Sequence, residues 1–163
     1  MEKIKNDVIN LLTENARYSF KEIAMILGVD EDTVCSVVSG LEKDGVIVKY
    51  SAILNSEILA EKTVQALIEV KVAPQKLKGF DSCAEEIYEF PEVQSLYLMS
   101  GGFDLAVFVE GADISDVARF IAEKLSVIDG IVAVQTHFIL KKYKIEGQVT
   151  KHLSEREREI IFA

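Results

Sequence analysis

Residues 100–104 read Ser-Gly-Gly-Phe-Asp and join a glycine pair to a single carboxylate. Backbone N–H groups in a glycine turn can hold a carboxylate, and an aspartate can pair with an ammonium group. A free amino acid carries both of these groups, so the segment predicts a small-metabolite site. The alternative interpretation is a plain hairpin turn that Asp104 caps.

Polar side chains also gather along residues 30–44. The apolar residues there, Val34, Val37, Val38 and Leu41, recur at helical spacing and predict one buried face. The other face carries short polar or acidic side chains and a single base: Asp30, Glu31, Asp32, Cys35, Ser36, Ser39 and Lys43. Ser, Thr and Asp can read base edges in DNA, although they offer phosphates nothing beyond hydrogen bonds.

The elements around this helix predict a helix-turn-helix. Residues 2–14 form a first helix, and Ser19 with Glu22 makes a capping box that opens a second. Gly28 ends that second helix and Asp30 is the N-cap of the third. Ala24, Gly28 and Val34 have the spacing of the motif. The alternative is a three-helix bundle that packs against a partner. Residues 46–50 are expected to add a short strand as a wing.

The second half of the chain has the period of β-strands. Strands are expected over 64–72, 93–100, 104–110 and 132–144, the middle two joined by a tight turn at Gly101–Gly102. Helices are expected over 77–90 and from Ile114 to Leu125. The order βαββαβ predicts a ferredoxin-like domain and an α+β fold class. The domains expected are a winged helix-turn-helix over 1–60, the βαββαβ domain over 61–147 and a tail over 148–163. The tail is either a disordered end or docks on a neighbouring subunit.

Both faces of the predicted sheet are partly apolar. Leu67 and Phe108 lie on the face that the two helices do not cover. A half-covered sheet with two apolar faces implies a partner. We therefore expect a homodimer or a higher homo-oligomer, and the alternative is that the N-terminal head covers this face.

The composition restricts the function. The net charge is -9, and residues 1–60 hold 6 Lys/Arg against 10 Asp/Glu, which argues against strong non-specific DNA binding. No apolar run approaches the roughly 20 residues of a membrane span, and no secretory signal is visible. Cys35 and Cys83 fit no metal spacing and are expected to be free thiols in a cytoplasmic protein. No catalytic set is visible, so neither catalysis nor a metal or other cofactor is expected.

The sequence resembles the leucine-responsive/asparagine-regulator (Lrp/AsnC) family of prokaryotic transcription regulators. Residues 23–55 resemble its DNA-binding head, and the segments 64–72, 100–111 and 129–144 resemble its effector-binding domain. The resemblance implies that residues 30–44 enter the major groove of double-stranded DNA and that amino acids bind between oligomeric βαββαβ domains. The DNA-binding residues are then Lys21, Asp32, Thr33, Cys35, Ser36, Ser39, Lys43 and Lys49. The effector-binding residues are Met99, Ser100, Gly101, Gly102, Phe103, Asp104 and Thr136.

This sequence departs from the family at two places. Family members commonly carry arginines along the third helix, where this chain has Val37, Ser39 and Gly40, and often an acidic residue or Asn in place of Gly102. The function expected is a DNA-binding regulator that senses an amino acid or a related metabolite. One alternative is a metabolite-binding oligomer whose helix-turn-helix contacts protein. The other is an enzyme, since some haem-pathway decarboxylases share this fold.

Overall fold

The structure is a computed structural model that describes residues 2–56, 58–60, 62–73 and 80–150. The chain divides into two compact units, Met1–Leu54 and Asn55–Ala163. Each unit has its own apolar core. The two units are therefore described separately.

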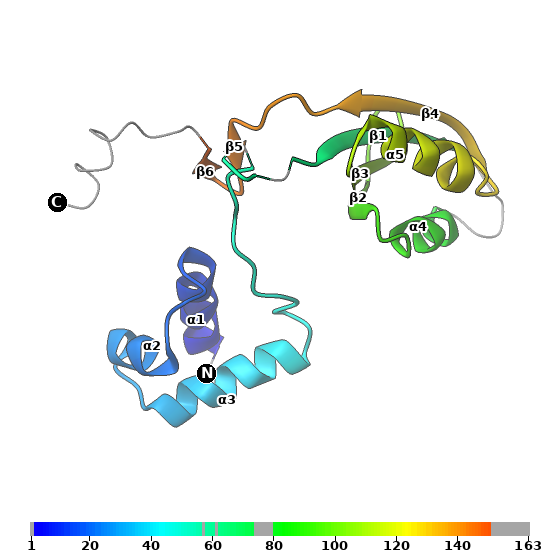
Figure 1. Cartoon of the computed structure of the whole chain (residues 1–163). Helices are drawn as coiled ribbons and strands as arrows, with labels where there is room; N and C mark the ends of the chain where they lie inside the picture. The colour runs from blue at the N-terminus through cyan, green and yellow to red at the C-terminus, as the bar shows by residue number, and fades with distance from the viewer. Residues whose placement is uncertain (1, 57, 61, 74–79, 151–163) are drawn as a thin grey trace. The chain divides into compact units, whose positions relative to one another are not determined.

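The first unit contains three helices, α1 Glu2–Glu14, α2 Phe20–Leu27 and α3 Glu31–Lys43 (Figure 1). One apolar face of each helix points into a shared core. The buried members of that core are Val8, Ile23, Ala24, Val34, Val37, Val38 and Leu41. The predicted helix-turn-helix is thus formed, with the small Ala24 where α2 and α3 pack together.

Local side-chain contacts define the ends of α2 and α3. The Ser19 N–H donates to the Glu22 carboxylate at 2.8 Å, and the Glu22 N–H donates back to the Ser19 hydroxyl, which confirms the capping box. Gly28 has a φ of 66° and ends α2 in the left-handed region. The Asp30 carboxylate accepts from the Thr33 N–H at 2.7 Å and begins α3.

The predicted wing strand over 46–50 is wrong. These residues form no strand, and the side chain of Val48 is 90% exposed. The N–H groups of Val46 and Ile47 both donate to the Leu41 carbonyl, at 2.9 and 3.1 Å, so the chain wraps the end of α3. A strand needs a neighbour for its backbone groups, and the described part of this unit contains no strand that could serve as one.

The second unit is an antiparallel sheet with two helices on one face (Figure 1). Its elements are β1 Val64–Val72, α4 Asp81–Tyr88, β2 Val93–Leu98, β3 Leu105–Gly111, α5 Ile114–Phe120 and β4 Ile131–Phe138. A π-helical turn, Ile121–Leu125, continues α5. The strand order β2-β3-β1-β4 is that of the predicted ferredoxin-like βαββαβ fold.

The core of this unit lies between the sheet and its helices. Alternate residues of β1 and β3 are buried there, as period-two strands require. They are Ala66, Ile68, Val70, Val72, Leu105, Val107 and Val109. The helices contribute Cys83, Ile87, Val117, Phe120 and Leu125. Within the described residues the core is therefore built by the predicted alternation.

Two predicted strands end earlier than expected. The strand over 93–100 stops at Leu98, and that over 132–144 begins at Ile131 and stops at Phe138. A separate hairpin follows, β5 Lys144–Ile145 paired with β6 Gln148–Val149. It turns through Glu146 and Gly147, at φ 46° and 81°. The predicted tail therefore begins with strand structure, and its residues 151–163, like Leu77 at the start of the predicted helix 77–90, lie outside the described residues.

Candidate functional site

The exposed face of α3 carries most of the residues predicted to contact DNA. Asp32, Ser36, Ser39 and Lys43 are spaced by three or four positions, so they share one side of the helix. All four are exposed, as is Cys35, while the opposite side is buried. The face therefore exposes hydroxyl, thiol and carboxylate groups to solvent, with one basic side chain, Lys43, at its C-terminal end.

Thr33 has a different position from the rest of this set. It is half-buried, and its hydroxyl donates to the Asp30 carboxylate at 2.7 Å. The hydrogen bonds from the Thr33 side chain and then from its backbone hold the pKa of Asp30 below its ordinary value. Thr33 thus serves the N-cap. Lys21 on α2 and Lys49, beyond α3, are exposed but lie outside α3.

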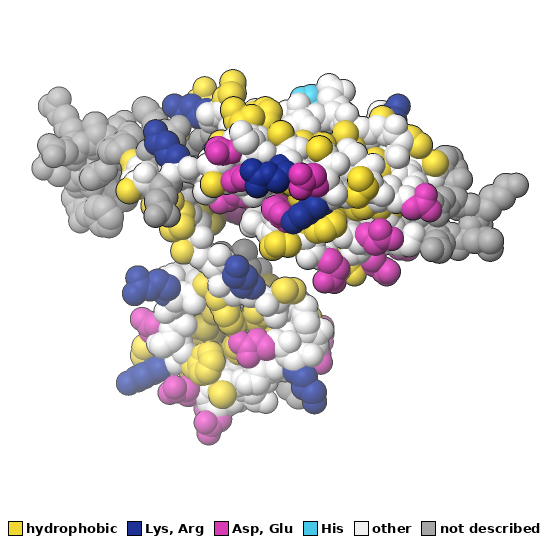
Figure 2. All heavy atoms as spheres, turned by 45° about the vertical axis from the view of Figure 1, so that its right-hand side comes forward, with side chains coloured by type: hydrophobic (Ala, Val, Ile, Leu, Met, Phe, Trp, Pro, Cys, Tyr) yellow, Lys and Arg dark blue, Asp and Glu magenta, His cyan; other side chains and the backbone are white. Residues whose placement is uncertain are grey.

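The visible face of the first unit carries charges of both signs (Figure 2). Figure 2 shows Lys and Arg side chains interspersed with Asp and Glu over the visible face of the first unit. Glu31 and Asp32 occupy the first turn of α3, where the backbone N–H groups of a helix otherwise attract anions. The two carboxylates therefore repel a phosphate at this end of the helix.

Exposed apolar residues on α2 were not anticipated from the sequence. Met25 is 67% exposed and Ile26 54% exposed, although both precede the turn into α3. Their positions outside the inner face Ile23, Ala24 and Leu27 are the signal that sequence reasoning passed over. Exposed apolar side chains of this kind can contact thymine methyl groups or another protein.

The segment predicted to bind a metabolite is a six-residue connection between β2 and β3, from Met99 to Asp104. It is longer than the tight turn expected from its glycines, because β2 ends two residues earlier than expected and β3 begins one residue later. Gly101 and Gly102 are exposed and neither has a positive φ. A Cβ added at either would meet nothing within 4 Å. Open space therefore lies beside the loop.

Asp104 anchors this loop to the end of the sheet. Its Oδ2 accepts from the Val72 N–H at 2.8 Å, and its own N–H donates to the Val70 carbonyl at 3.0 Å. Its carbonyl accepts from the Met99 N–H at 2.8 Å, which closes the loop. One carboxylate oxygen thus has the capping role that the alternative interpretation assigned to Asp104.

Thr136 does not lie with the loop within one chain. It pairs with Ile68 in the register of β1 and β4, and it is half-buried on the face that the helices cover. The loop joins β2 to β3, and β1 separates β3 from β4. One chain therefore groups Met99 to Asp104 and leaves Thr136 on a different strand pair.

The other face of the sheet carries apolar and ionic groups side by side. Leu67 and Phe108 are register partners and half-buried, and Tyr97 packs edge-on against Phe108 with ring centroids 6.0 Å apart. His137 Nε2 lies 3.2 Å from a Glu69 carboxylate oxygen. Both helices lie on the opposite face (Figure 1).

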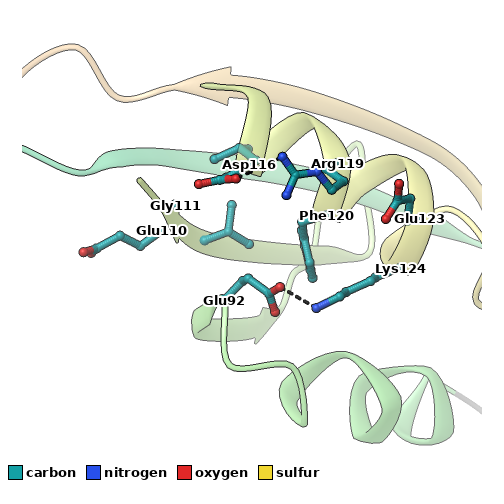
Figure 3. Close-up of a pocket in the computed structure, with 10 residues that line it drawn as sticks. Glu92, Glu110, Gly111, Asp116, Arg119, Phe120, Glu123 and Lys124 are labelled. Atoms are coloured by element: carbon teal, nitrogen blue, oxygen red, sulfur yellow. Dashed lines mark hydrogen bonds and ion pairs between the residues drawn. The ribbon is translucent and has the colours of Figure 1, made fainter. Parts of the chain in front are cut away.

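A cavity of about 330 Å³ lies between α5 and the ends of β2 and β3 (Figure 3). Its charged groups pair with one another, since Lys124 Nζ lies 2.5 Å from Glu92 and Arg119 lies 3.3 Å from Asp116. The Lys124 hydrogen bond holds the pKa of Glu92 below its ordinary value. The Lys124–Glu92 pair joins the π-helical turn after α5 to the start of β2, whereas the Arg119–Asp116 pair lies within α5. No sequence pattern predicted either pair.

The comparisons with known proteins identify the family. The family described as the Lrp/AsnC ligand binding domain matches residues 65–149. The uncharacterized HTH-type transcriptional regulator YugG of Bacillus subtilis is 42% identical over 158 residues, which cover 96% of this chain and 95% of YugG. This chain belongs to the Lrp/AsnC family. HTH-type transcriptional regulator LrpA of Pyrococcus abyssi is 35% identical over 84% of this chain and 94% of its own.

A solved structure agrees with this Lrp/AsnC assignment at the level of the fold. A transcriptional regulator of Neisseria meningitidis, determined as a complex with L-Met, matches with a TM-score of 0.69 and 24% identity. The match covers 89% of this chain and 93% of that one. The protein is therefore an HTH-type transcriptional regulator whose second unit is the ligand-binding domain of its family, and its relatives are named as regulators and not as enzymes. No helix in the described residues is long and apolar enough to cross a membrane.

Proposed function

We propose that this Lrp/AsnC regulator binds double-stranded DNA through the exposed face of α3 and changes that binding when an amino acid or related metabolite occupies the loop 99–104. The observation that carries the proposal is the capped α2–turn–α3 pair, which presents a continuous polar face. A regulator that reads DNA in this way works in the cytoplasm. Neither catalysis nor a cofactor is part of the proposal.

The polarity of α3 supports reading of bases more than attraction to phosphates. Asp32, Ser36 and Ser39 are short acceptors and donors on one exposed side. Such side chains form hydrogen bonds with base edges in the major groove. The single basic side chain of α3, Lys43, adds little contact with phosphates. Binding is therefore expected to depend on the DNA sequence.

The geometry of the loop 99–104 supports a small anionic group as one part of the ligand. Backbone N–H groups of successive loop residues can surround a carboxylate, and the space beside Gly101 and Gly102 is open. The L-Met complex of the Neisseria regulator concerns that protein, and it gives a reason to test amino acids first. Because Thr136 lies on another strand pair, its contribution requires a second copy of the chain.

The uncovered face of the sheet supports a homodimer as the working unit. Leu67, Phe108 and Tyr97 would be partly exposed in a monomer. We expect the full chain to sediment as a dimer or larger species at micromolar concentration, and Phe108→Lys to shift it toward the monomer. Arg119→Glu, an exposed change on the opposite face of this unit, is the control. A wild-type chain that sediments as a monomer would remove this part of the proposal.

Selection of duplexes from a random pool tests DNA binding. The full chain should enrich one sequence and bind it about 10³-fold or more tightly than random duplex. Ser36→Leu should lower that ratio, because it removes a polar contact from the exposed face. Ser115→Leu is the matched control, since Ser115 is an exposed helix residue in the second unit. Failure of the folded chain to enrich any sequence would refute the proposal.

A thermal-shift series with the twenty amino acids tests the effector. A ligand at 100 times its Kd stabilises the native state by about 2.7 kcal/mol. Gly102→Val should abolish the shift, because a Cβ there meets nothing within 4 Å and the side chain then fills the space that a ligand would occupy. Gly40→Val, at an equally open position in α3, is the matched control. A ligand whose shift survives in Gly102→Val binds elsewhere.

A second candidate function is a metabolite-binding oligomer whose helix-turn-helix contacts protein. The acidic first turn of α3 and the exposed Met25 and Ile26 favour it. The same duplex selection separates the two functions, since a protein-contact module would enrich no sequence. A single Met25→Asp substitution would then abolish the protein contact.

A further inference from the structure

A lysine-lined groove of about 430 Å³ lies in the second unit. One wall is the chain that leads into β1, and the other is the chain that follows β4. The first wall contributes Ser56, Lys62, Thr63 and Gln65, and the second contributes Ile139, Leu140, Lys141 and Lys142. Ammonium and hydroxyl groups thus border one hollow, while the Gln65 amide donates to the Glu110 carboxylate at 2.5 Å. Ammonium and hydroxyl groups are donors that bind a phosphate.

Hydrogen bonds hold the two walls in place. The Ile139 N–H donates to the Gln65 carbonyl at 2.8 Å and joins the walls directly. The hydroxyl of Thr150 donates to the Lys142 carbonyl, and the Asn55 side-chain amide donates to the Thr150 carbonyl at 2.9 Å. Thr150 is only 7% exposed, the one buried polar residue in the described part of the chain. A buried side chain therefore fixes the backbone that carries the lysines.

The groove is locally basic in an acidic protein. The segments 55–65 and 139–145 together hold four lysines against two glutamates, while the whole chain has a net charge of -9. The two glutamates, Glu57 and Glu61, lie outside the described residues. Lys141 Nζ lies 5.4 Å from the centroid of the Tyr143 ring, which orients its side chain. The excess of lysines around the groove favours an anion as its ligand.

We propose that the groove binds the phosphate backbone of duplex DNA as a second contact, in addition to that of the helix-turn-helix. This inference rests on the proposed DNA binding. Ser56 follows Leu54, the last residue of the first unit, by two positions, which span at most about 7 Å. The first wall of the groove therefore begins directly after the DNA-binding unit in the sequence. Because α3 has a single basic side chain, Lys43, most phosphate contacts must come from other parts of the chain.

The salt dependence of binding measures this contact. Each phosphate neutralised by a lysine contributes about -0.9 to the slope of log affinity against log salt. The double variant Lys141→Gln/Lys142→Gln should therefore make the slope less negative by about 1.8 for each protomer whose groove contacts DNA. Over a fourfold rise in salt, the affinity of the wild type then falls about 12-fold more than that of the variant.

The experiment is fluorescence anisotropy of the full chain on a 40-base-pair duplex of mixed sequence, titrated with potassium chloride. Arg119→Gln, which removes an exposed positive charge from α5, should leave the slope unchanged. Thr150→Val keeps the charge and removes the hydroxyl that holds Lys142, so it should weaken binding at low salt. Circular dichroism confirms that each variant is folded.

Three outcomes overturn the inference. If the wild type binds the duplex and the double variant keeps its slope, the groove does not contact DNA, although the proposed function stands. If inorganic phosphate raises the melting temperature of the wild type alone and the slopes agree, the groove is a site for a small anion. If the wild type binds no duplex, this inference and the proposed DNA binding fail together.

Discussion

Substitution of Asp104 tests whether its carboxylate supports the fold or the ligand. In the structure its Oδ2 accepts the Val72 N–H at 2.8 Å, and Val72 is 7% exposed. Asp104→Ala leaves that N–H without a partner in a place that water reaches poorly. An unsatisfied buried donor costs about 1–3 kcal/mol. At roughly 2–4 °C per kcal/mol for a chain of this size, the melting temperature should fall by about 2–12 °C.

Asp104→Asn separates the two roles. The amide oxygen can still accept from Val72, and a neutral acceptor makes a bond about half as strong as a carboxylate does, so the loss should be about half as large. If the carboxylate also pairs with the ammonium group of an amino acid, Asp104→Asn should lose the ligand-induced shift as well. If the shift persists, Asp104 is a capping residue only.

Differential scanning fluorimetry with and without the best amino acid of the screen provides both readouts. Asp129→Ala, which removes an exposed aspartate after α5, should change stability by no more than about 0.5 kcal/mol. An Asp104→Ala protein that melts with the wild type would refute the reasoning, because the Val72 hydrogen bond would then contribute nothing.

Three further predictions concern residues of the first unit, and Cys83 of the second unit serves as a comparison in one of them. Glu31→Gln/Asp32→Gln should strengthen binding to random duplex and steepen its salt dependence in an anisotropy titration, and unchanged affinity would mean that α3 does not face DNA. In the native protein Cys35 should react with a thiol reagent, and the modified protein should lose DNA binding. Cys83 should stay unmodified, because burial raises the pKa of its thiol, and two fast thiols would contradict this. The lowered pKa of Asp30 means that its cap is complete above about pH 3.8 and is lost as the pH falls through the lowered value, so Asp30→Ala should flatten the acid limb of helicity measured by circular dichroism.

Elements governed by neighbours in sequence were predicted correctly. The capping box of Ser19 and Glu22, the Gly28 turn and the Asp30 cap each depend on residues within four positions. The alternation of β1 likewise reports its own burial, because a sheet covered on one face buries every second residue. The fold class followed from the order of such elements.

Errors arose where a distant partner decides the outcome. Residues 46–50 have strand composition, yet no neighbouring strand is present in the described part of the first unit, so they remain irregular. The strand after Ile131 ends at Phe138, and a last hydrogen bond from the Ile139 N–H to the Gln65 carbonyl at 2.8 Å follows its final register pair, Ala66 with Phe138. The chain then turns at Glu146 and Gly147 and pairs with itself. A glycine after an exposed polar residue was the available signal.

The candidate sites were less predictable than the fold. Residues 99–104 are contiguous, so the sequence placed the loop, but the bond from Asp104 to Val72 depends on where β1 ends. The groove between 56–65 and 139–142 joins segments about eighty positions apart, and the Thr150 side chain that supports it is distant from the first of them. Its lysines looked like ordinary solvated charges, since no local pattern distinguishes a lysine in a groove from one on a flat surface.

The charge distribution has a consequence for specificity under the proposed function. Carboxylates in the first turn of α3 repel phosphates wherever the helix meets DNA, so they weaken binding to every sequence by a similar amount. Base contacts from Ser36 and Ser39 restore affinity only at matching sequences. Under the same proposal, lysines outside α3 supply phosphate attraction without occupying the helix face that contacts the bases. Because a genome offers about 10⁶–10⁹ competing sites, an acidic reading helix with a separate basic contact discriminates better than a uniformly basic head of the same total affinity.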